Sequence, residues 1–516
     1  MSNQSSNNKR IARNTLLLYF RMFITMAVGL FTSRVILDSL GVEDYGIYNL
    51  VGGFVTMFNI FRAGLISSTQ RFITFDLGKG DMNELRNTFS TSLIIFLFIS
   101  CVIVVIAEVI APWFIQNKLT IPECRMTAAM WVFQFSLITL ILNLISSPYN
   151  ALIIAHEKMG AFAYISIFEV VAKLVVAYAI YISPFDKLII YSLLLCIVQV
   201  IIRFMYSIYC NRHFKESKLE WRVNWIKVKK IYAFTGWELF GSVAVIGYTQ
   251  GLNILLGMFF TPVVNAARGI AVQVQNMVLG FVTNFQTALN PQITKSYASG
   301  DIVYMNKLIF YSSKLSFFLL FALSLPVILE ADELLALWLV EVPEYTVIFF
   351  RLIIITTMID AISNPIITSV EATGNIKKYQ IVVGSILLLI LPVSYIVIKL
   401  GAAPYAVFIV HIVMSAVAFT ARLRMGSVVT GFLCMDFIKR VLLPIIGVVI
   451  ISAIIPLLIH FAMPLGWIRM LVVGCISVLS VAVGVYLIGL QHNEKEILLN
   501  FIRKKILKRK DDTNKR

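Results

Sequence analysis

Residues 14–37 read NTLLLYFRMFITMAVGLFTSRVIL, and residues 45–67 read YGIYNLVGGFVTMFNIFRAGLIS. A short acidic segment with Asp38, Glu43 and Asp44 separates these two apolar runs. Each run is long enough to cross a bilayer, because about 20 apolar helical residues span about 30 Å of hydrocarbon. We therefore expect two membrane-spanning helices joined by an acidic hairpin.

Arginines interrupt both runs. Arg21 and Arg34 lie in the first run and Arg62 lies in the second. An arginine at membrane depth costs several kcal/mol or more, so it usually faces a bundle interior or a wet cavity. Its planar guanidinium can bind two phosphate oxygens at once. The pair of helices is therefore predicted to line a cationic, water-filled cavity; snorkelling to the interface is the alternative, above all for Arg34.

The composition is that of a polytopic membrane protein. Of the 516 residues, 59% are hydrophobic and 14% are charged, whereas a soluble domain has about 25% charged residues. The formal charge of +17 does not indicate nucleic acid, because the basic residues gather in short loops and at the termini. The six cysteines are scattered, so we expect no disulfide framework, no metal site and no other cofactor. The polar start predicts no removable signal peptide.

Fourteen spans can be placed, and the chain divides by composition. Basic loops alternate with acidic or uncharged ones, which predicts that both termini lie in the cytoplasm. The basic loop between the sixth and seventh spans, residues 211–230, carries Trp221 and Trp225 at helical spacing. This pattern is typical of an amphipathic helix on a lipid surface. The spans are 14–37, 45–67, 87–111, 126–147, 159–182, 187–210, 231–258, 264–289, 308–328, 345–367, 379–399, 403–423, 437–461 and 466–490. The predicted parts are a cytoplasmic N-terminus (1–13), a six-helix lobe (14–210), a cytoplasmic linker (211–230), a second six-helix lobe (231–423), two additional helices (437–490) and a basic tail (491–516).

The chain contains a weak internal repeat. Pro148 ends span four and Pro365 ends span ten, an offset of 365 − 148 = 217. Gly80 precedes span three and Gly300 precedes span nine, an offset of 300 − 80 = 220. Two six-span halves of equal orientation are predicted, and transporters built from such repeats bind their substrate between the halves near mid-membrane.

Other charged residues also lie inside predicted spans. Glu169 and Lys173 stand four residues apart in span five, where they can neutralise each other on one helix face or form a titrating site. Glu238 and Asp360 are further candidates for H⁺ or Na⁺ coupling, because intramembrane acids commonly serve such relays. The alternative is a structural role, in which these acids pair with intramembrane bases such as Lys314.

Span eight is too hydrophilic to face lipid. Arg268, Gln273 and Asn276 are among its polar residues, and span two is similar. Both helices are expected to line the central cavity, where arginines would meet an anionic head group and amides would meet sugar hydroxyls. The predicted substrate site therefore comprises Arg21, Arg34, Arg62, Arg268, Gln273 and Asn276.

A family resemblance follows from the first hairpin. Arg34, then Leu40-Gly41, then Tyr45-Gly46-Ile47-Tyr48, resemble the pattern of bacterial Wzx-type polysaccharide flippases of the multidrug/oligosaccharidyl-lipid/polysaccharide (MOP) exporter superfamily. The resemblance implies an all-α, MATE-like fold with two six-helix lobes in the bacterial cytoplasmic (inner) membrane. It also implies alternating access that moves undecaprenyl-pyrophosphate-linked oligosaccharide from the cytoplasmic to the periplasmic leaflet. The product would be surface polysaccharide such as O-antigen, capsule or exopolysaccharide.

The same resemblance implies the partners. They are the lipid-linked oligosaccharide, membrane lipids and the polysaccharide polymerase machinery, with the transporter as a monomer that binds no nucleic acid. Lipid II flippases of the superfamily use a cationic cavity formed by the first two helices of each lobe. By position, Arg21, Arg34, Arg62 and Arg268 are similar, whereas span seven departs from that pattern with Glu238.

Two other classes stay open. A MATE-like cation-coupled antiporter of small molecules would share the fold, although cationic drugs favour an acid-lined cavity. A membrane enzyme of polysaccharide assembly would need a sizeable external loop with catalytic side chains. The five histidines form no cluster and no Walker motif occurs, so we expect neither an enzyme nor direct use of ATP.

Overall fold

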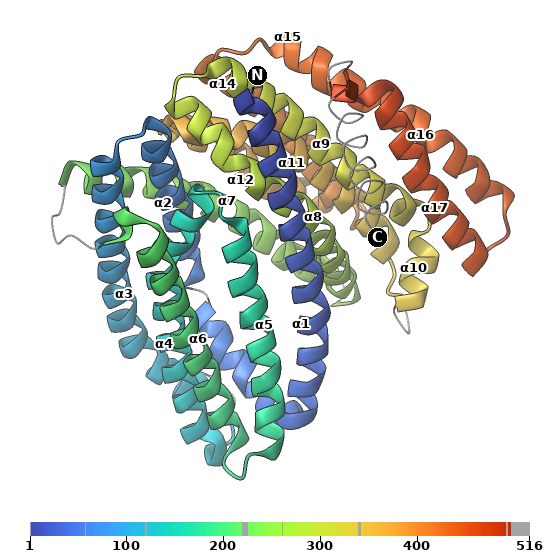
Figure 1. Cartoon of the computed structure of the whole chain (residues 1–516). Coiled ribbons are helices and arrows are strands. Elements are labelled where there is room, and N and C mark those ends of the chain that lie inside the picture. Colours follow the sequence, from blue (N-terminus) through green and yellow to red (C-terminus); the bar gives the residue numbers. More distant parts are fainter. Residues whose placement is uncertain are drawn as a thin grey trace, which may run out of the picture. The chain divides into compact units, whose positions relative to one another are not determined.

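The computed structural model describes residues 2–56, 58–118, 121–218, 225–260, 262–338, 342–491 and 494–496, which form helices without any strand. Figure 1 shows their arrangement along the chain. The long helices are α1 (Ser2–Thr56), α2 (Asn59–Lys79), α3 (Met82–Lys118), α4 (Met126–Ala155), α5 (Met159–Ile182), α6 (Lys187–His213), α7 (Trp225–Phe259), α8 (Pro262–Ala298), α9 (Ile302–Leu329), α11 (Thr346–Thr373), α12 (Lys377–Leu388), α13 (Ile390–Lys399), α14 (Ala406–Thr430), α16 (Leu443–Ala462) and α17 (Trp467–Gly484). The short helical elements are η1 (Glu123–Arg125), η2 (Lys215–Ser217), α10 (Ala331–Trp338), α15 (Cys434–Phe437), η3 (Ile438–Leu442) and η4 (Val485–Gly489).

Within the described residues, 12 helical segments are long and apolar enough to cross a membrane. They correspond to 12 of the 14 predicted spans. The other two predicted spans, 45–67 and 264–289, fall on the end of α1 with α2 and on α8. Both segments are rich in polar residues, which is why the sequence predicts that they line a cavity. The polar residues lower the mean hydropathy of both segments.

The first predicted helix pair has a different form. Residues 2–56 form one long helix, α1, with a single non-helical residue at Gly41 (φ 77°, ψ 168°). The predicted second span is divided, because α1 ends at Thr56 and α2 begins at Asn59. The predicted acidic hairpin is therefore a break within α1. Glycine permits it, since a residue with a Cβ rarely adopts this combination of angles.

The two predicted helix-ending prolines lie inside helices instead. Pro148 lies within α4 and Pro365 lies within α11. A proline leaves the carbonyl four residues earlier without its usual donor. For Pro365 that carbonyl belongs to Ala361, and Gln286 Nε2 donates to it at 3.0 Å. A neighbouring side chain thus satisfies the freed group, as is common in membrane helices.

Contacts group the chain into two compact units, each assembled from three segments. Unit 1 comprises residues 1–247, 287–305 and 368–385, and unit 2 comprises residues 248–286, 306–367 and 386–516. This division does not test the lobe boundaries that the sequence predicts, so these boundaries stay a prediction. The predicted linker helix falls partly on residues 219–224, outside the described residues, and from Trp225 onward the chain is the first part of α7.

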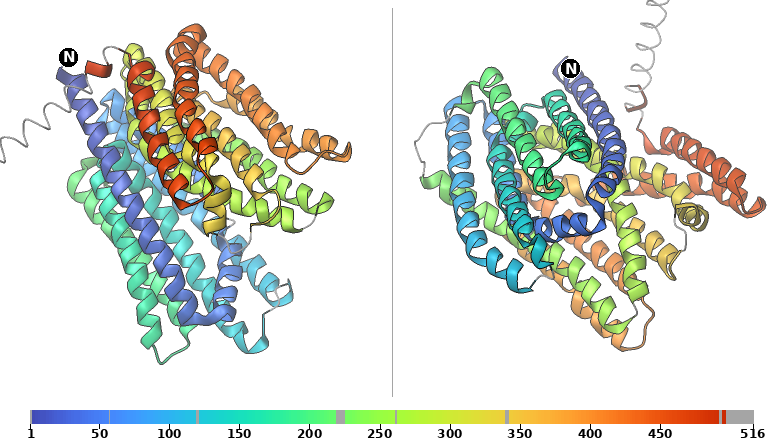
Figure 2. Two further views of the ribbon diagram at one scale, coloured as in Figure 1. Left: turned by 90° about the vertical axis from the view of Figure 1, so that its right-hand side faces the viewer. Right: turned by 90° about the horizontal axis from the view of Figure 1, so that it is seen from below.

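Unit 1 is a helical bundle in which two pairs of long helices run side by side. α1 packs along α5, and α4 packs along α6 (Figures 1 and 2). Large apolar side chains fill the space between the helices: Phe89 and Phe133 are fully buried, and the ring of Phe89 meets Tyr149 edge to face at 5.1 Å. Phe89 and Tyr149 belong to an apolar cluster that also includes Ile165 of α5 and Val198 of α6, so α3, α4, α5 and α6 share one interior.

Charged residues fix both ends of α4. At its start, Arg125 Nε donates to Asp44 at 2.8 Å, and Nη1 donates to Asp186 at 2.6 Å. Asp186 also caps α6 by accepting from two backbone N–H groups, at 3.0 and 3.2 Å. Arg125 therefore ties the segment of α1 beyond Gly41 to the first turns of α4 and α6.

At the other end of α4, Glu157 is fully buried and its carboxylate accepts from three side chains. Arg10 lies 2.8 Å away, Lys295 2.6 Å, and Gln292 2.7 and 2.8 Å from the two oxygens. Asn14 donates to the Glu157 carbonyl at 3.0 Å. Burial lowers the pKa of Lys295, and the Glu157 carboxylate opposes that shift. This Glu157 cluster joins the start of α1, the α4–α5 turn and the end of α8.

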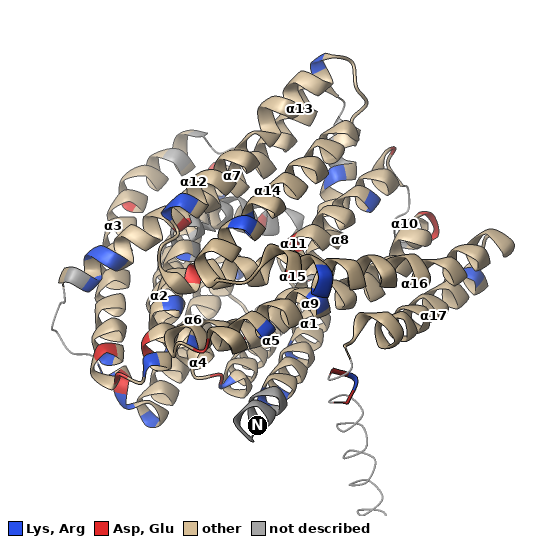
Figure 3. Cartoon of the chain, turned by 90° about the horizontal axis from the view of Figure 1, so that it is seen from above, with Lys and Arg blue, Asp and Glu red and all other residues tan. Residues whose placement is uncertain are grey.

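Unit 2 contains two buried ion-pair sites that hold its last helices. Glu330, at the start of the acidic segment that continues into α10 (Figure 3), accepts from Arg469 of α17 at 2.8 Å and contacts His460 of α16 at 2.8 Å. Lys314 of α9, only 2% exposed, donates to Glu494 at 2.7 Å. Both pairs connect α9 or its end to chain segments that follow residue 442.

Candidate functional site: a polar cavity in unit 1

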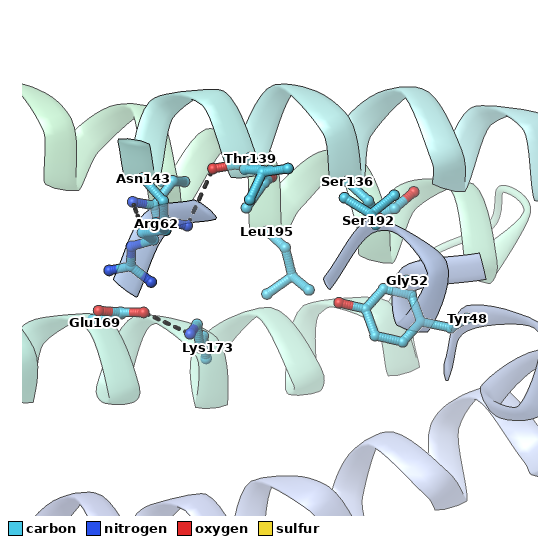
Figure 4. A pocket seen from close by; sticks show the side chains of 13 residues that line it. Tyr48, Gly52, Arg62, Ser136, Thr139, Asn143, Glu169, Lys173, Ser192 and Leu195 are labelled. Atoms are coloured by element: carbon cyan, nitrogen blue, oxygen red, sulfur yellow. Dashed lines mark hydrogen bonds and ion pairs between the residues drawn. The ribbon is translucent and has the colours of Figure 1, made fainter. Parts of the chain in front are cut away.

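A cavity of about 430 Å³ lies among α1, α2, α4, α5 and α6 of unit 1. This volume falls in the range of small-molecule sites, about 300–1,000 Å³. Figure 4 shows the side chains that point toward it. Its lining residues are Tyr48, Gly52, Val55, Arg62, Ser136, Thr139, Leu140, Asn143, Glu169, Lys173, Ser192, Leu195 and Gln199.

A polar stripe on α4 forms one wall. Ser136, Thr139 and Asn143 are spaced by three and four residues, which places them on one helix face. On α6, Ser192 and Gln199 are seven residues apart and again share a face. Gln199 Nε2 donates to Asn143 Oδ1 at 2.9 Å, and Asn143 Nδ2 donates to the Thr139 carbonyl at 3.1 Å. These bonds fix the orientation of both amides.

The opposite wall carries the charges. Glu169 and Lys173 of α5 form the ion pair that their spacing allows, with Nζ 2.6 Å from Oε1. Arg62 of α2 lies within electrostatic reach of Glu169. Its guanidinium donates no hydrogen bond to any described residue, and its Nε is buried without a partner. The cavity thus contains two cations and one anion, a net charge of +1.

The cavity has a charged end and a neutral end. Figure 4 shows Arg62, Asn143 and Glu169 at one end, and Tyr48, Ser136 and Ser192 at the other, with Leu195 between them. A ligand that fits this arrangement carries an anion at one end and an uncharged, hydroxyl-bearing group at the other.

The other predicted arginines of unit 1 have different surroundings. The Arg21 guanidinium lies over the Phe162 ring, 4.6 Å from its centroid, and is not part of the cavity lining. Arg21 and Arg62 both lie within electrostatic reach of Tyr206. The side chain of Arg34 lies outside the described residues.

The predicted site residues of span eight belong to unit 2. Arg268 is 6% exposed and donates to the side chain of Asn253 and, at 2.9 Å, to the carbonyl of Thr249. The side chains of Gln273 and Asn276 are exposed. Arg268 therefore has partners on α7, whereas Arg62 donates no hydrogen bond within the described part of unit 1.

The two remaining coupling candidates have different surroundings. Glu238 of α7 is 8% exposed and lies near Glu371 and Gln380 within unit 1, and its Oε1 is buried without a hydrogen-bond partner among the described residues. Asp360 of α11 pairs with Arg422 at 3.4 Å in unit 2. Of the four coupling candidates, only Glu169 and Lys173 line the cavity. No group of three His, Cys, Asp or Glu side chains in the described part of the chain could hold a metal ion.

Sequence reasoning missed the α4 and α6 walls. The predicted site includes no residue of span four, although Ser136, Thr139 and Asn143 recur there at helical spacing. Polar side chains in a membrane helix are costly unless they meet partners or water, so this periodicity was the available signal. Tyr48 was noted only as part of a motif, because the sequence does not show which way an aromatic ring points.

Comparison with known proteins agrees with this geometry at the level of fold. A family model named MatE matches residues 18–179, a range that contains most of the cavity lining. A solved structure of MATE in complex with MaD3S is 13% identical, with a TM-score of 0.70, and the alignment covers 83% of this chain and 97% of that one. The chain has the MATE fold. It is a multi-pass membrane protein.

Other solved structures give the same result. An outward-facing multidrug resistance MATE family transporter of the MOP superfamily is 13% identical with a TM-score of 0.70, over 82% of this chain and 96% of that one. The MATE transporter ClbM in complex with Rb⁺ is 16% identical with a TM-score of 0.68, over 80% of this chain and 94% of that one. No curated protein matches the chain. The predicted all-α MATE-like fold is confirmed.

Proposed function

We propose that this MATE-fold protein is a flippase for an anionic lipid-linked saccharide, undecaprenyl-pyrophosphate-linked oligosaccharide. It carries the head group by alternating access from the cytoplasmic to the periplasmic leaflet of a bacterial inner membrane. The observation that supports this proposal is Arg62, a guanidinium beside a polar cavity that donates no hydrogen bond within the described residues.

The chemistry of the head group explains the need for such a cavity. A pyrophosphate and its sugars cannot enter hydrocarbon unaided, because each desolvated charge or hydroxyl costs kilocalories. Arg62 and Lys173 supply positive charge, and the amides and hydroxyls of α4 and α6 replace lost water. A guanidinium suits the pyrophosphate because it donates two parallel hydrogen bonds.

A second candidate is a MATE-like cation-coupled antiporter of small molecules. The comparisons favour it over the flippase, since the matched structures are MATE transporters and one is a complex with Rb⁺. Glu169 is the carboxylate of the cavity that could accept H⁺ or Na⁺. Its pairing with Lys173 leaves less negative charge for a cationic drug, which is why the anionic substrate is proposed first.

The deciding experiment measures the leaflet distribution of a fluorescent polyprenyl-pyrophosphate-linked oligosaccharide in proteoliposomes. We expect the wild-type protein to equilibrate the lipid between leaflets. Arg62→Gln removes the cation and is expected to slow transfer by about tenfold or more, the equivalent of one lost charge-assisted hydrogen bond.

Arg212→Gln is the matched control, because Arg212 is an exposed residue at the end of α6 outside the cavity. It should leave transfer unchanged. Transfer at the wild-type rate by Arg62→Gln would contradict the proposed role of Arg62. A wild-type protein that moves an organic cation against an H⁺ or Na⁺ gradient, and does not move the lipid, would establish the antiporter instead.

A further inference from the structure

The neutral end of the cavity has unused hydrogen-bonding capacity. The Ser136 hydroxyl forms no hydrogen bond with any described residue. Ser192 is already bonded to carbonyls of its own helix, at 2.9 and 3.2 Å. Gln199 donates to Asn143 and therefore belongs to the charged end. The neutral end thus presents a hydroxyl that a ligand can use.

An aromatic ring stands beside these groups. Tyr48 lines the cavity, and its ring meets Tyr191 edge to face at 4.8 Å. This contact holds the ring of Tyr48 in place, since edge-to-face pairs are a favoured arrangement. A fixed ring offers a flat apolar surface next to polar groups, and pockets of this kind orient ligands that have both an apolar face and a polar rim.

We propose that Tyr48 and Ser136 form a saccharide subsite that binds the sugar ring attached to the pyrophosphate at Arg62. The inference rests on the proposed function and names the group that the neutral end recognises. A pyranose has a C–H face that can lie on the Tyr48 ring, and hydroxyls at its rim that can exchange hydrogen bonds with Ser136.

The length of the wall agrees with this assignment. Ser136 and Asn143 are seven residues apart on α4, about 10 Å along the helix. The charged end is next to Asn143 and the neutral end is next to Ser136 (Figure 4). An anion and one adjoining sugar ring therefore occupy successive parts of one wall. A lipid tail does not suit the wall, because the hydroxyls and amides would lose their water without replacement.

The test compares two probes on the full-length protein in lipid nanodiscs. One probe is polyprenyl pyrophosphate, and the other is the same lipid with a single N-acetylhexosamine. We expect the wild-type protein to bind the glycosylated probe about tenfold more tightly, or about 1.4 kcal/mol. Tyr48→Leu should remove most of that preference, measured as the ratio of the two dissociation constants. Tyr48→Phe, which keeps the ring, should retain it.

Ser136→Ala provides a second variant at a small side chain, so the test does not depend on how well Tyr48→Leu folds. It should likewise reduce the ratio of the two dissociation constants. Equal binding of both probes by the wild-type protein, or a preference unchanged in Tyr48→Leu and Ser136→Ala, would overturn the subsite. Failure of the proposed function looks different: neither probe would bind, or Arg62→Gln would bind both probes as well as the wild-type protein does.

Discussion

Glu157 shows how strongly one residue can depend on its neighbours. Its carboxylate is fully buried, and Arg10, Gln292 and Lys295 donate to it. Glu157→Gln keeps the shape but removes the charge, which leaves the largely buried Lys295 ammonium without its counter-ion. Removing one partner of a buried ion pair typically costs about 3–5 kcal/mol. We expect thermal unfolding in detergent to show a loss near the lower value, because Arg10 is partly exposed.

Glu123→Gln is the control for this prediction. Glu123 is an exposed residue of η1, at the other end of α4. A surface change of this kind is usually worth within about 0.5 kcal/mol. If the two variants melt at the same temperature, the Glu157 cluster contributes little to the stability of unit 1.

At the scale of a helix, α1 offers a matched pair of glycines. Gly41 has φ 77° and ψ 168°, whereas Gly29 lies within regular helix. A Cβ at either position would meet no atom within 4 Å, so neither alanine substitution causes a steric clash. Gly41→Ala should destabilise the protein by about 1–3 kcal/mol through backbone strain. Gly29→Ala should be neutral or stabilise it by up to about 1 kcal/mol, because alanine favours the helix.

Thermal unfolding of the two alanine variants side by side measures this difference. An equal response would mean that α1 does not keep its break at Gly41. The sequence places Gly41 in the acidic segment between the two apolar runs and Gly29 inside the first run, so it indicates a break near Gly41. It does not show that the helix continues on both sides of a single residue. Asp44, just beyond Gly41, is held by Arg125, and that contact between distant parts of the chain fixes the position of the break.

Helices were predicted well where hydropathy alone determines that a helix is present. They were predicted poorly where contacts with distant residues determine whether a helix continues. Twelve predicted spans correspond to described helices that are long and apolar enough to cross a membrane. Pro148 and Pro365 were expected to end helices, but Gln286 satisfies the carbonyl that Pro365 leaves free, and sequence does not show such a partner. In the site, Arg62 and the Glu169–Lys173 pair were predicted from their unusual charge. The stripe on α4 was missed because its residues are uncharged.

At the scale of the whole molecule, unit 2 depends on a residue close to the end of the described chain. Lys314 is 2% exposed, and its ammonium lies 2.7 Å from Glu494. Glu494→Gln should destabilise unit 2 by about 3 kcal/mol, because it leaves a buried cation unpaired. The double variant Lys314→Met with Glu494→Gln should recover most of the loss, since it removes the buried cation that the single change leaves unpaired.

Thermal unfolding of the two single variants and the double variant gives the coupling energy directly. Additive losses would show that Lys314 and Glu494 do not stabilise each other. This pairing could not be predicted, because the two residues are 180 positions apart and each has several potential partners of opposite charge.

The Glu157 cluster also imposes an order on biosynthesis. Glu157 leaves the ribosome 138 residues before Lys295. At about 5–20 residues per second, that interval is on the order of ten seconds. Throughout it, the α4–α5 turn has Arg10 and Asn14 but neither donor from α8. The set of donors around Glu157 is therefore complete only after the ribosome has made the end of α8.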